Sequence, residues 1–396
     1  MSNSRIDTNV LRLATAQALA GANSAVVYAT GAIVGNTLAP DPTLATLPIS
    51  IFVAGMAIST LPSGTLARRK GRHAAFLTGN ICGTVSGMLA AVGIYLDSFW
   101  LFCVAMLFGG AYAAIVLTFR FAVAECVPPE KRAKALSTVM AGGVLAGVLG
   151  PQLATATMNY WPPHIYAATY VSAAVVAVLS ALILRGVRFQ YHTPEPLTGG
   201  RRIGQIIRQP KLIVAMACGL VSYMLMNFLM TSAPLAMDLC GIDRGAANWG
   251  IQWHIMAMYS PSFFTGRLIT RFGASRIVLT GLVVIAFAAL LGHAGNDVGY
   301  FWGSLILLGI GWNFGFLGAS AMVLECHRPE ERTRVQSIND FVVFGSMVIG
   351  SFLSGGLLTH FGWATVCLMA LPPILLTIVS ILGLNFNERR RRSLAL

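Results

Sequence analysis

The sequence predicts an all-α membrane protein of twelve transmembrane helices, arranged as two six-helix bundles. Three observations carry this prediction: the composition, the alternation of basic and acidic loops, and an internal repeat. Of the 396 residues, 56% are hydrophobic and only 10% are charged, whereas soluble proteins average roughly 25% charged residues. Long apolar runs recur from Leu11 to Phe386. A run of about 20 apolar residues is long enough to cross a bilayer.

Polar and Pro/Gly-rich breaks divide these runs into twelve expected spans. The spans are 11–39, 44–66, 74–96, 99–124, 134–158, 164–187, 210–237, 246–269, 275–294, 299–326, 335–358 and 361–385. The first has no short h-region followed by a small-residue cleavage site, so we expect a retained helix. The expected domains are an N-terminal six-helix bundle over 1–188, a cytoplasmic linker over 189–210 and a C-terminal six-helix bundle over 211–396.

The formal net charge of +13 is distributed by topology. Basic residues gather in every second loop: Arg68, Arg69, Lys70, Arg72, Lys131, Arg132, Lys134, the segment Arg185 to Lys211, Arg271, Arg276, Arg328, Arg332, Arg334 and Arg389 to Arg392. The other loops carry Asp41, Asp97, Asp238, Asp243 and Asp297. By the positive-inside rule both termini are cytoplasmic. We therefore expect a multi-pass protein in the lipid bilayer of a bacterial inner membrane, and no nucleic-acid partner.

The two halves of the chain repeat each other. A motif recurs at an offset of 200 residues, first as Glu125-Cys126-x-x-Pro129-Glu130-x-Arg132 and then as Glu325-Cys326-x-x-Pro329-Glu330-x-Arg332. A second motif recurs at an offset of 202, as Gly64-x-Leu66-x-x-Arg69-x-Gly71 and Gly266-x-Leu268-x-x-Arg271-x-Gly273. Duplicated halves with a substrate path at their interface are typical of secondary transporters.

Two pairs of residues with metal-ligating side chains lie in consecutive expected spans. Met226 and Met230 are four residues apart in the seventh span, and His254 and Met258 are four apart in the eighth. This spacing puts each pair on one face of its helix. Thioether and imidazole donors without a carboxylate favour Cu(I). The helical rise places Met230 and His254 about 12 Å from the outer end of their spans, and Met226 and Met258 about 18 Å.

The repeat offers a comparison for these four positions. The 202-residue offset sets Ser24 against Met226, Tyr28 against Met230, Phe52 against His254 and Met56 against Met258. Only Met56 keeps a soft donor, so the donor set departs from the duplicated scaffold. Met56 is a secondary metal-ligand candidate, together with Cys218, Cys240 and Met237 on the seventh span.

The loop after the second span resembles a family signature. Its residues Gly64, Arg68, Arg69, Gly71 and Arg72 resemble the Gly-x-Leu-Ala-Asp-Arg-x-Gly-Arg-Lys signature of the major facilitator superfamily. The resemblance implies the major facilitator fold, alternating access and a gating role for this loop. Arg68 replaces the aspartate of the signature. Because that acid helps to latch cytoplasmic helix ends in many relatives, the inward gate is expected to be held differently here.

Within that superfamily, the Met and His pairs resemble those of the CcoA-type copper importers of bacterial inner membranes, where such pairs are the proposed copper ligands. The resemblance implies a copper importer, with copper as the transported substrate and no cofactor. It also implies periplasmic or cytoplasmic copper carriers as candidate partners. We expect a monomer.

An alternative interpretation remains open. Methionine also fills gaps in apolar cores, and the chain could transport a small organic solute or drug, with Tyr223, Phe228 and Trp253 as the contact surface. His254 is the one histidine deep within an expected span. An ionisable side chain at that depth favours a functional role, although a hydrogen bond to a backbone carbonyl would also account for it. The sequence contains no apparent Ser/His/Asp arrangement, phosphate loop or closed zinc set, so we do not expect an enzyme.

Overall fold

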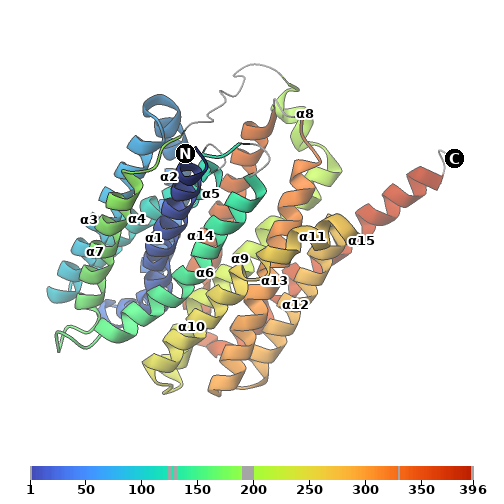
Figure 1. Ribbon diagram of the computed structural model, residues 1–396. Coiled ribbons are helices and arrows are strands. Elements are labelled where there is room, and N and C mark those ends of the chain that lie inside the picture. The colour runs from blue at the N-terminus through green and yellow to red at the C-terminus, as the bar shows by residue number, and fades with distance from the viewer. Residues whose placement is uncertain (1, 124–125, 129–131, 190–199, 329–330, 394–396) are drawn as a thin grey trace.

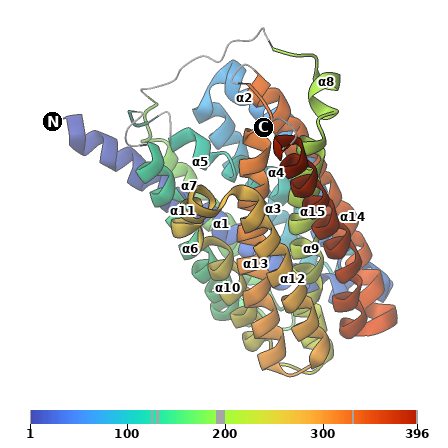
Figure 2. The ribbon, with the colours of Figure 1, turned by 90° about the vertical axis from the view of Figure 1, so that its right-hand side faces the viewer.

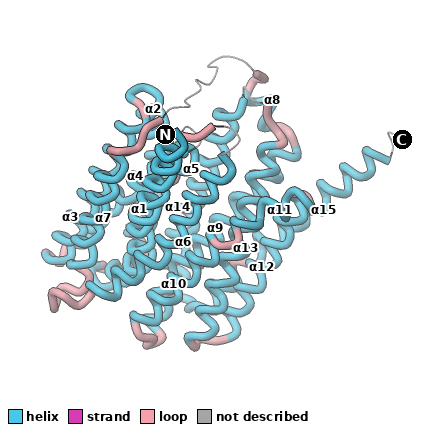
Figure 3. Tube along the Cα trace, viewed as in Figure 1, coloured by secondary structure: helices cyan, strands magenta, loops and turns pink. Residues whose placement is uncertain are grey.

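The structure, a computed structural model, describes residues 2–123, 126–128, 132–189, 200–328 and 331–393. The described residues form helices and connecting turns without a strand (Figure 3). In chain order the elements are α1 Ser2–Leu38, the 3₁₀ turn η1 Pro42–Leu44, α2 Leu47–Lys70, α3 Arg72–Tyr95, α4 Phe99–Val116, α5 Phe119–Ala122, α6 Arg132–Thr157, α7 Ala167–Leu184, α8 Ile203–Ile207, α9 Pro210–Leu239, α10 Arg244–Tyr259, α11 Ser262–Phe272, α12 Ala274–Ala294, α13 Val298–Leu324, α14 Arg332–Met369 and α15 Leu371–Ser393.

The helices form two groups that lie side by side. Figure 1 shows α2, α3, α4 and α7 on the left and α11, α12, α13 and α15 on the right, with α10 and α14 near the middle of the view. In the first group α1 packs against α6, and α4 packs against α2 and α3. In the second group α13 packs against α12, and α14 packs against α9. The groups meet where α6 contacts α10, α2 contacts α14 and α1 contacts α9.

Ten helical stretches among the described residues are long and apolar enough to cross a membrane. The expected eighth span is divided between α10 and α11, each too short to qualify alone. The expected eleventh and twelfth spans share the 49-residue stretch Ile338–Phe386, which is divided at Gly362, where φ is 77° and ψ is 172°. Figure 2 shows α15 running back beside α14. The predicted fold class, an all-α protein with twelve crossings, is therefore confirmed.

The amide side chain of Asn313, on the neighbouring helix α13, forms hydrogen bonds on both sides of the break between α10 and α11. Pro261 lies between the two helices and has no N–H to continue the hydrogen-bond ladder. The buried amide of Asn313 on α13 donates to Met258 O at 2.6 Å and to Ser262 Oγ at 2.7 Å. At membrane depth, freed backbone groups need partners within the protein. Asn313 therefore fixes the end of α10 in one place.

The second repeat motif appears as two equivalent turns. Gly71 ends α2 and precedes α3 with φ of 85°, and Gly273 ends α11 and precedes α12 with φ of 87°. Glycine adopts this left-handed conformation without the penalty that a Cβ imposes. Arg69 is exposed beside the first turn, whereas the side chain of Arg68 lies outside the described ones. The gating role of this loop stays a prediction.

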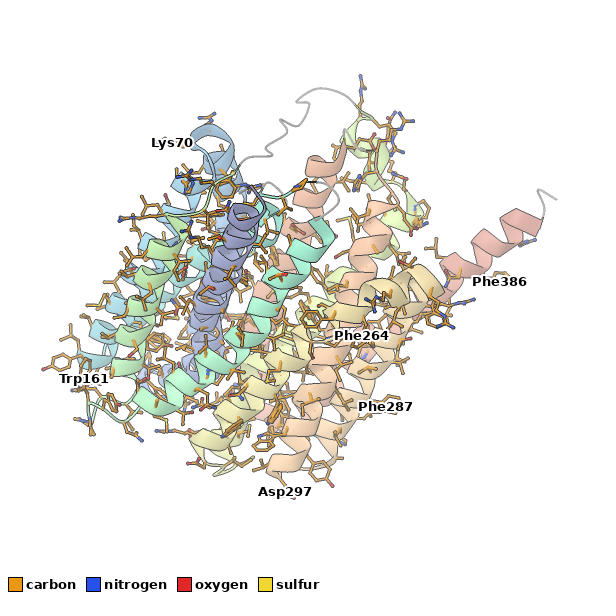
Figure 4. The ribbon with its side chains drawn as sticks, in the orientation of Figure 1. Lys70, Trp161, Phe264, Phe287, Asp297 and Phe386 are labelled. Atoms are coloured by element: carbon orange, nitrogen blue, oxygen red, sulfur yellow. The ribbon has the colours of Figure 1, made fainter. Side chains whose placement is uncertain are left out.

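The halves are in close contact at one end of the molecule. Figure 4 shows Lys70 at one end and Trp161 and Asp297 at the other. Four side-chain hydrogen bonds join the halves toward the end that carries Trp161 and Asp297. They run from Thr46 to Ser351 O at 3.4 Å, from Ser50 to Ser351 Oγ at 3.1 Å, from Gln152 to Gln252 at 2.7 Å and from Asn248 to Thr155 at 2.9 Å. We call this contact the distal seal.

The distal seal also depends on a glycine, which leaves room for a side chain of the other half. At Gly355 of α14, an added Cβ would overlap the hydroxyl oxygen of Thr46. The neighbouring Gly356 has no heavy atom within 4 Å of such a Cβ. Close approach of the two halves at this end therefore requires a glycine at position 355 but not at position 356.

The segment before α9 is tied to the connection between α13 and α14. The Glu331 side chain has 0% of its surface exposed, and it accepts from Arg201 Nε at 2.9 Å and from Arg201 Nη2 at 2.8 Å. The backbone N–H groups of Arg201 and Arg328 also donate to it, at 2.7 and 3.0 Å. The Arg201 guanidinium, followed by the Arg328 backbone N–H, holds the pKa of Glu331 well below its usual range.

We predict that Glu331→Gln lowers the thermal unfolding midpoint of the purified protein. Because the folded-state pKa is depressed, the stabilisation is complete above the unfolded-state pKa of about 4.3 and is lost as the pH falls through the folded-state value. The difference in midpoint between wild type and variant should stay constant from about pH 8 to 5.5 and shrink below about pH 4.5.

The matched control is Glu325→Gln. Glu325 pairs with Lys211 at 2.7 Å, but its side chain is 53% exposed, and exposed ion pairs contribute little. An effect of Glu325→Gln as large as that of Glu331→Gln would contradict the special role of the buried carboxylate.

Candidate functional site

A cavity of about 90 Å³ lies between the two halves, about midway along the helices. Residues of α1, α2, α4 and α6 line it from the first half, and residues of α9 and α10 from the second. Tyr28 lies ten residues before the end of α1, and Met230 lies nine before the end of α9, which is about 14–15 Å at the helical rise. The cavity therefore has the position and depth expected of a transporter's substrate site.

Thioethers form much of the cavity lining. Met226 and Met230 reach it from α9, Met258 from the end of α10 and Met56 from α2. Three of the four predicted metal-site residues and one secondary candidate thus come together. The four-residue spacing on α9 does place two methionines on one face, and that face borders the cavity.

His254 lies apart from the cavity lining. Its side chain is buried, and Nδ1 lies 2.7 Å from Leu305 O on α13. A carbonyl oxygen only accepts, so Nδ1 carries the proton. Nε2 is buried and has no hydrogen-bond partner among the described residues. The imidazole therefore faces α13, and it does not join the methionines.

The other predicted site residues are scattered. Cys218 and Met237 are buried in α9 without bordering the cavity, and Cys240 is exposed where α9 ends. No group of three or more His, Cys, Asp or Glu side chains that could hold a metal occurs in the described part of the chain.

For a small organic solute, the sequence analysis named Tyr223, Phe228 and Trp253 as the contact surface, and only one of them borders the cavity. Tyr223 borders the cavity, whereas Phe228 is buried elsewhere and Trp253 is 37% exposed.

Several lining residues were not singled out by the sequence analysis: Gln17, Ser24, Tyr28, Phe52 and Tyr259. A signal for three of them was nevertheless present. The 202-residue offset sets Ser24, Tyr28 and Phe52 against positions of the predicted metal site. Both halves thus contribute equivalent positions to the lining, and the repeat could have identified those of the first half.

Hydrogen bonds and ring contacts hold the walls of the cavity. The Tyr28 hydroxyl donates to Asn227 Oδ1 at 3.0 Å, and Asn227 Nδ2 donates to Met347 O at 3.2 Å. This chain of bonds links α1, α9 and α14. Tyr223 packs edge-on against three rings, those of Trp312, Phe316 and Phe344, at centroid distances of 5.2, 4.9 and 5.8 Å. A rigid aromatic wall therefore stands behind the α9 side of the cavity.

The lining is uncharged. None of the residues that border the cavity is Asp, Glu, Lys, Arg or His. Its polar groups are the Gln17 amide and the hydroxyls of Ser24, Tyr28, Tyr223 and Tyr259. Thioethers and rings contact flat aromatic faces well, and a few amide and hydroxyl groups can orient a ligand by hydrogen bonds. The cavity suits a neutral, flat organic molecule with a polar edge.

Comparison with known proteins gives a relative with an assigned substrate. The chain is 43% identical over 377 residues to the riboflavin transporter RfnT of Brucella anthropi, covering 94% of this chain and 95% of that protein. Two solved structures share the fold. The nucleoside transporter NupG aligns over 95% of this chain and 99% of its own with a TM-score of 0.75 at 12% identity. The xylose transporter XylE of E. coli aligns over 96% and 98% with a TM-score of 0.71 at 14% identity.

The prediction of copper import is wrong. A relative that is 43% identical over nearly its whole length is a transporter of an organic molecule, and nothing in the comparisons supports a likeness to copper importers. Copper and copper carriers are therefore not the partners of this chain. The physical reason is that methionine serves equally as a soft ligand and as an apolar contact. Met226, Met230 and Met258 border an uncharged cavity, and His254 is hydrogen-bonded to a backbone carbonyl of α13 instead.

The family resemblance itself is confirmed. The Major Facilitator Superfamily model matches residues 13–260 and 215–395, which together span nearly all of the chain. The two groups of helices and the cavity between them fit this match. The chain is a multi-pass transporter that belongs to the Major Facilitator Superfamily.

Proposed function

We propose that this protein transports riboflavin, or a closely related neutral flavin, across the bacterial inner membrane by alternating access. The observation that carries the proposal is the uncharged cavity between the halves, lined by thioethers and aromatic side chains. The riboflavin transporter that is 43% identical over 94% of the chain supports the choice of substrate.

The chemistry of the flavin ring matches the lining. The ring is flat and neutral, with an apolar dimethylbenzene edge and a polar edge of carbonyl and N–H groups. Methionine sulfur and aromatic rings bind such faces by dispersion and quadrupole interactions worth about 0.3–1.5 kcal/mol each. The Gln17 amide and the tyrosine hydroxyls can pair with the polar edge. An uncharged site also avoids the cost of burying an unpaired charge.

The state of the molecule fits the inward-facing step of the cycle. The distal seal joins the halves at the end that carries Trp161 and Asp297. The cavity extends the other way, to Val116 and Leu117 at the end of α4. If the basic loops are cytoplasmic, as the positive-inside rule indicates, the cavity is closed to the periplasm and lies toward the cytoplasm.

We predict that the chain restores growth of a riboflavin-auxotrophic bacterium without its own importer at limiting riboflavin. Met258→Leu should keep initial uptake within about twofold, because it conserves volume and apolar contact. Met258→Trp should lower uptake at least tenfold, because the larger side chain fills the cavity. The initial rate of radiolabelled riboflavin uptake measures the effect of each variant.

Two further outcomes test the same proposal. A copper chelator should leave riboflavin uptake unchanged, because the lining offers the substrate apolar and hydrogen-bonding contacts. If Met258→Leu and Met258→Trp lose riboflavin uptake equally, with equal amounts of protein in the membrane, Met258 does not act as an apolar contact.

We predict that Gly355→Ala lowers riboflavin uptake to less than about a fifth of wild type. The added Cβ overlaps the Thr46 hydroxyl and keeps the distal seal from closing. Thr46→Ala in the same chain should restore part of the rate, because it removes the oxygen that the new methyl group meets. Gly356→Ala is the control, since its Cβ meets no neighbour. A Gly355→Ala variant with full uptake would show that the cycle does not require this close approach.

We also predict that a membrane-impermeant maleimide labels the protein from outside intact cells, and that Cys240→Ser abolishes the labelling. Cys240 is exposed, whereas five of the other six cysteines are buried and Cys82 is partly buried. Cys240 lies at the end of the molecule opposite the basic loops. If both termini are cytoplasmic, this end faces the periplasm. Labelling that needs permeabilised cells would reverse the proposed orientation.

A further inference from the structure

The α1 helix turns one face to the cavity between the halves. Gln17, Gly21, Ser24 and Tyr28 border the cavity, and their spacings of four, three and four residues put them on one side of a helix. Gln17 precedes Tyr28 by eleven residues in α1, which is about 16 Å at the helical rise. Gln17 therefore borders the cavity on the side that faces away from the distal seal.

The Gln17 side chain extends along α1 over Gly21, toward the middle of the cavity. A Cβ added at Gly21 would lie 3.6 Å from Gln17 Nε2, and Gly21 is the next residue of α1 that borders the cavity. Because Gly21 has no side chain, that residue does not separate the amide from the cavity.

Gln17 and Tyr259 meet the same turn of α6 from opposite halves of the molecule. A Cβ added at Gly142 would lie 3.1 Å from Gln17 Cβ, and one added at Gly143 would lie 3.1 Å from the Tyr259 ring. Consecutive residues differ by about 1.5 Å along a helix. A flat ligand whose edge meets the Gln17 amide would therefore lie beside the Tyr259 ring and the neighbouring Met258 thioether, which also border the cavity.

The Gln17 amide keeps its hydrogen-bonding capacity for a ligand. It forms no hydrogen bond with another residue in the described part of the chain, and Gln17 is only partly buried. The Tyr28 hydroxyl, on the same face of α1, donates its one hydrogen to Asn227 Oδ1 at 3.0 Å. Among the residues that border the cavity, Gln17 alone holds a donor and an acceptor side by side in one plane.

A cyclic imide is the ligand edge that matches this amide. Its carbonyl and its ring N–H stand side by side in one plane, so a primary amide can donate to the carbonyl and accept from the N–H at the same time. Glutamine and asparagine read the edge of adenine by two parallel hydrogen bonds in the same way. A lone ring carbonyl would form only one of these bonds, and a carboxylate would bring a charge into an uncharged lining.

We propose that Gln17 selects the substrate by pairing its amide with a cyclic imide on the edge of a flat heteroaromatic ring. This inference rests on the proposed function and deepens it, because the ring of riboflavin carries such an imide on its polar edge. The imide N–H donates to Gln17 Oε1, and an imide carbonyl accepts from Gln17 Nε2. The apolar remainder of the ring is left for the thioethers that border the cavity.

The test compares riboflavin with N3-methylriboflavin, in which a methyl group replaces the imide hydrogen. Quenching of flavin fluorescence by the purified full-length protein gives the two dissociation constants. The wild type should bind N3-methylriboflavin about fivefold to thirtyfold more weakly, because the methyl group removes one hydrogen bond and holds the amide away from the other. This comparison uses no variant, so its result does not depend on how a substitution affects folding.

Gln17→Met removes the amide and keeps an unbranched side chain of similar length. It should weaken riboflavin binding by a similar factor, and it should bring the two flavins to within about twofold of each other. Loss of the difference between the two ligands indicates a direct contact, because a merely structural effect would weaken both flavins equally.

Two control variants leave the Gln17 amide in place. Gln205→Met makes the same substitution at an exposed residue of α8 that does not border the cavity, and both dissociation constants should keep their wild-type values. Ser24→Ala removes another polar group from the same face of α1, and the wild-type ratio of the two dissociation constants should persist.

The outcomes separate this inference from the proposed function. If the wild type binds riboflavin and N3-methylriboflavin equally, if Gln17→Met keeps the wild-type ratio, or if Ser24→Ala abolishes that ratio, Gln17 does not read the imide, and riboflavin transport is not called into question. If the wild type binds neither flavin, the proposed function fails, and the inference fails with it. A preference for riboflavin that Gln17→Met abolishes supports both.

Discussion

The constraint on which this structure depends is that polar groups at membrane depth must find partners inside the protein. Along most of the chain, the hydrogen bonds within helices pair the backbone N–H and C=O groups. At the break at Pro261, the Asn313 amide instead donates to Met258 O and Ser262 Oγ. Because that amide fixes the end of α10, it also fixes Met258 and Tyr259 at the wall of the cavity between the halves. One nitrogen of His254 obeys the same rule, because its Nδ1–H is bonded to Leu305 O, whereas Nε2 has no partner among the described residues.

Much of the fold could be predicted from the sequence, because hydropathy and loop charge act locally along the chain. The runs of apolar residues gave the crossings, and the repeat gave two equivalent glycine turns at Gly71 and Gly273. The division of the eighth span into α10 and α11 was not predicted. Pro62 lies inside α2, which continues through it, whereas Pro261 ends a helix. The outcome depends on the partner that Asn313 supplies from a helix far along the chain.

The candidate site was predictable in part, and the limit is again physical. Four-residue spacing identified Met226 and Met230 as neighbours on one face, and both border the cavity. Spacing alone does not say which neighbour a face meets, so the contact of His254 with α13 could not be foreseen. Nor does it say what a thioether contacts, because its atoms suit a soft ion and an aromatic ring alike. The position of His254 outside the lining and the relative that transports riboflavin distinguish these uses.

The duplicated scaffold carries different chemistry in its two halves. Equivalent positions hold Ser24 and Tyr28 in the first half but Met226 and Met230 in the second. The first half adds the Gln17 amide, and the second adds the rings packed around Tyr223. A ligand with an apolar part and a polar edge would therefore contact the two halves with different parts of its structure. In a cycle where the halves rock against each other, such a ligand stabilises the states in which both contacts form together, and a fragment with only one part would hold the halves less firmly.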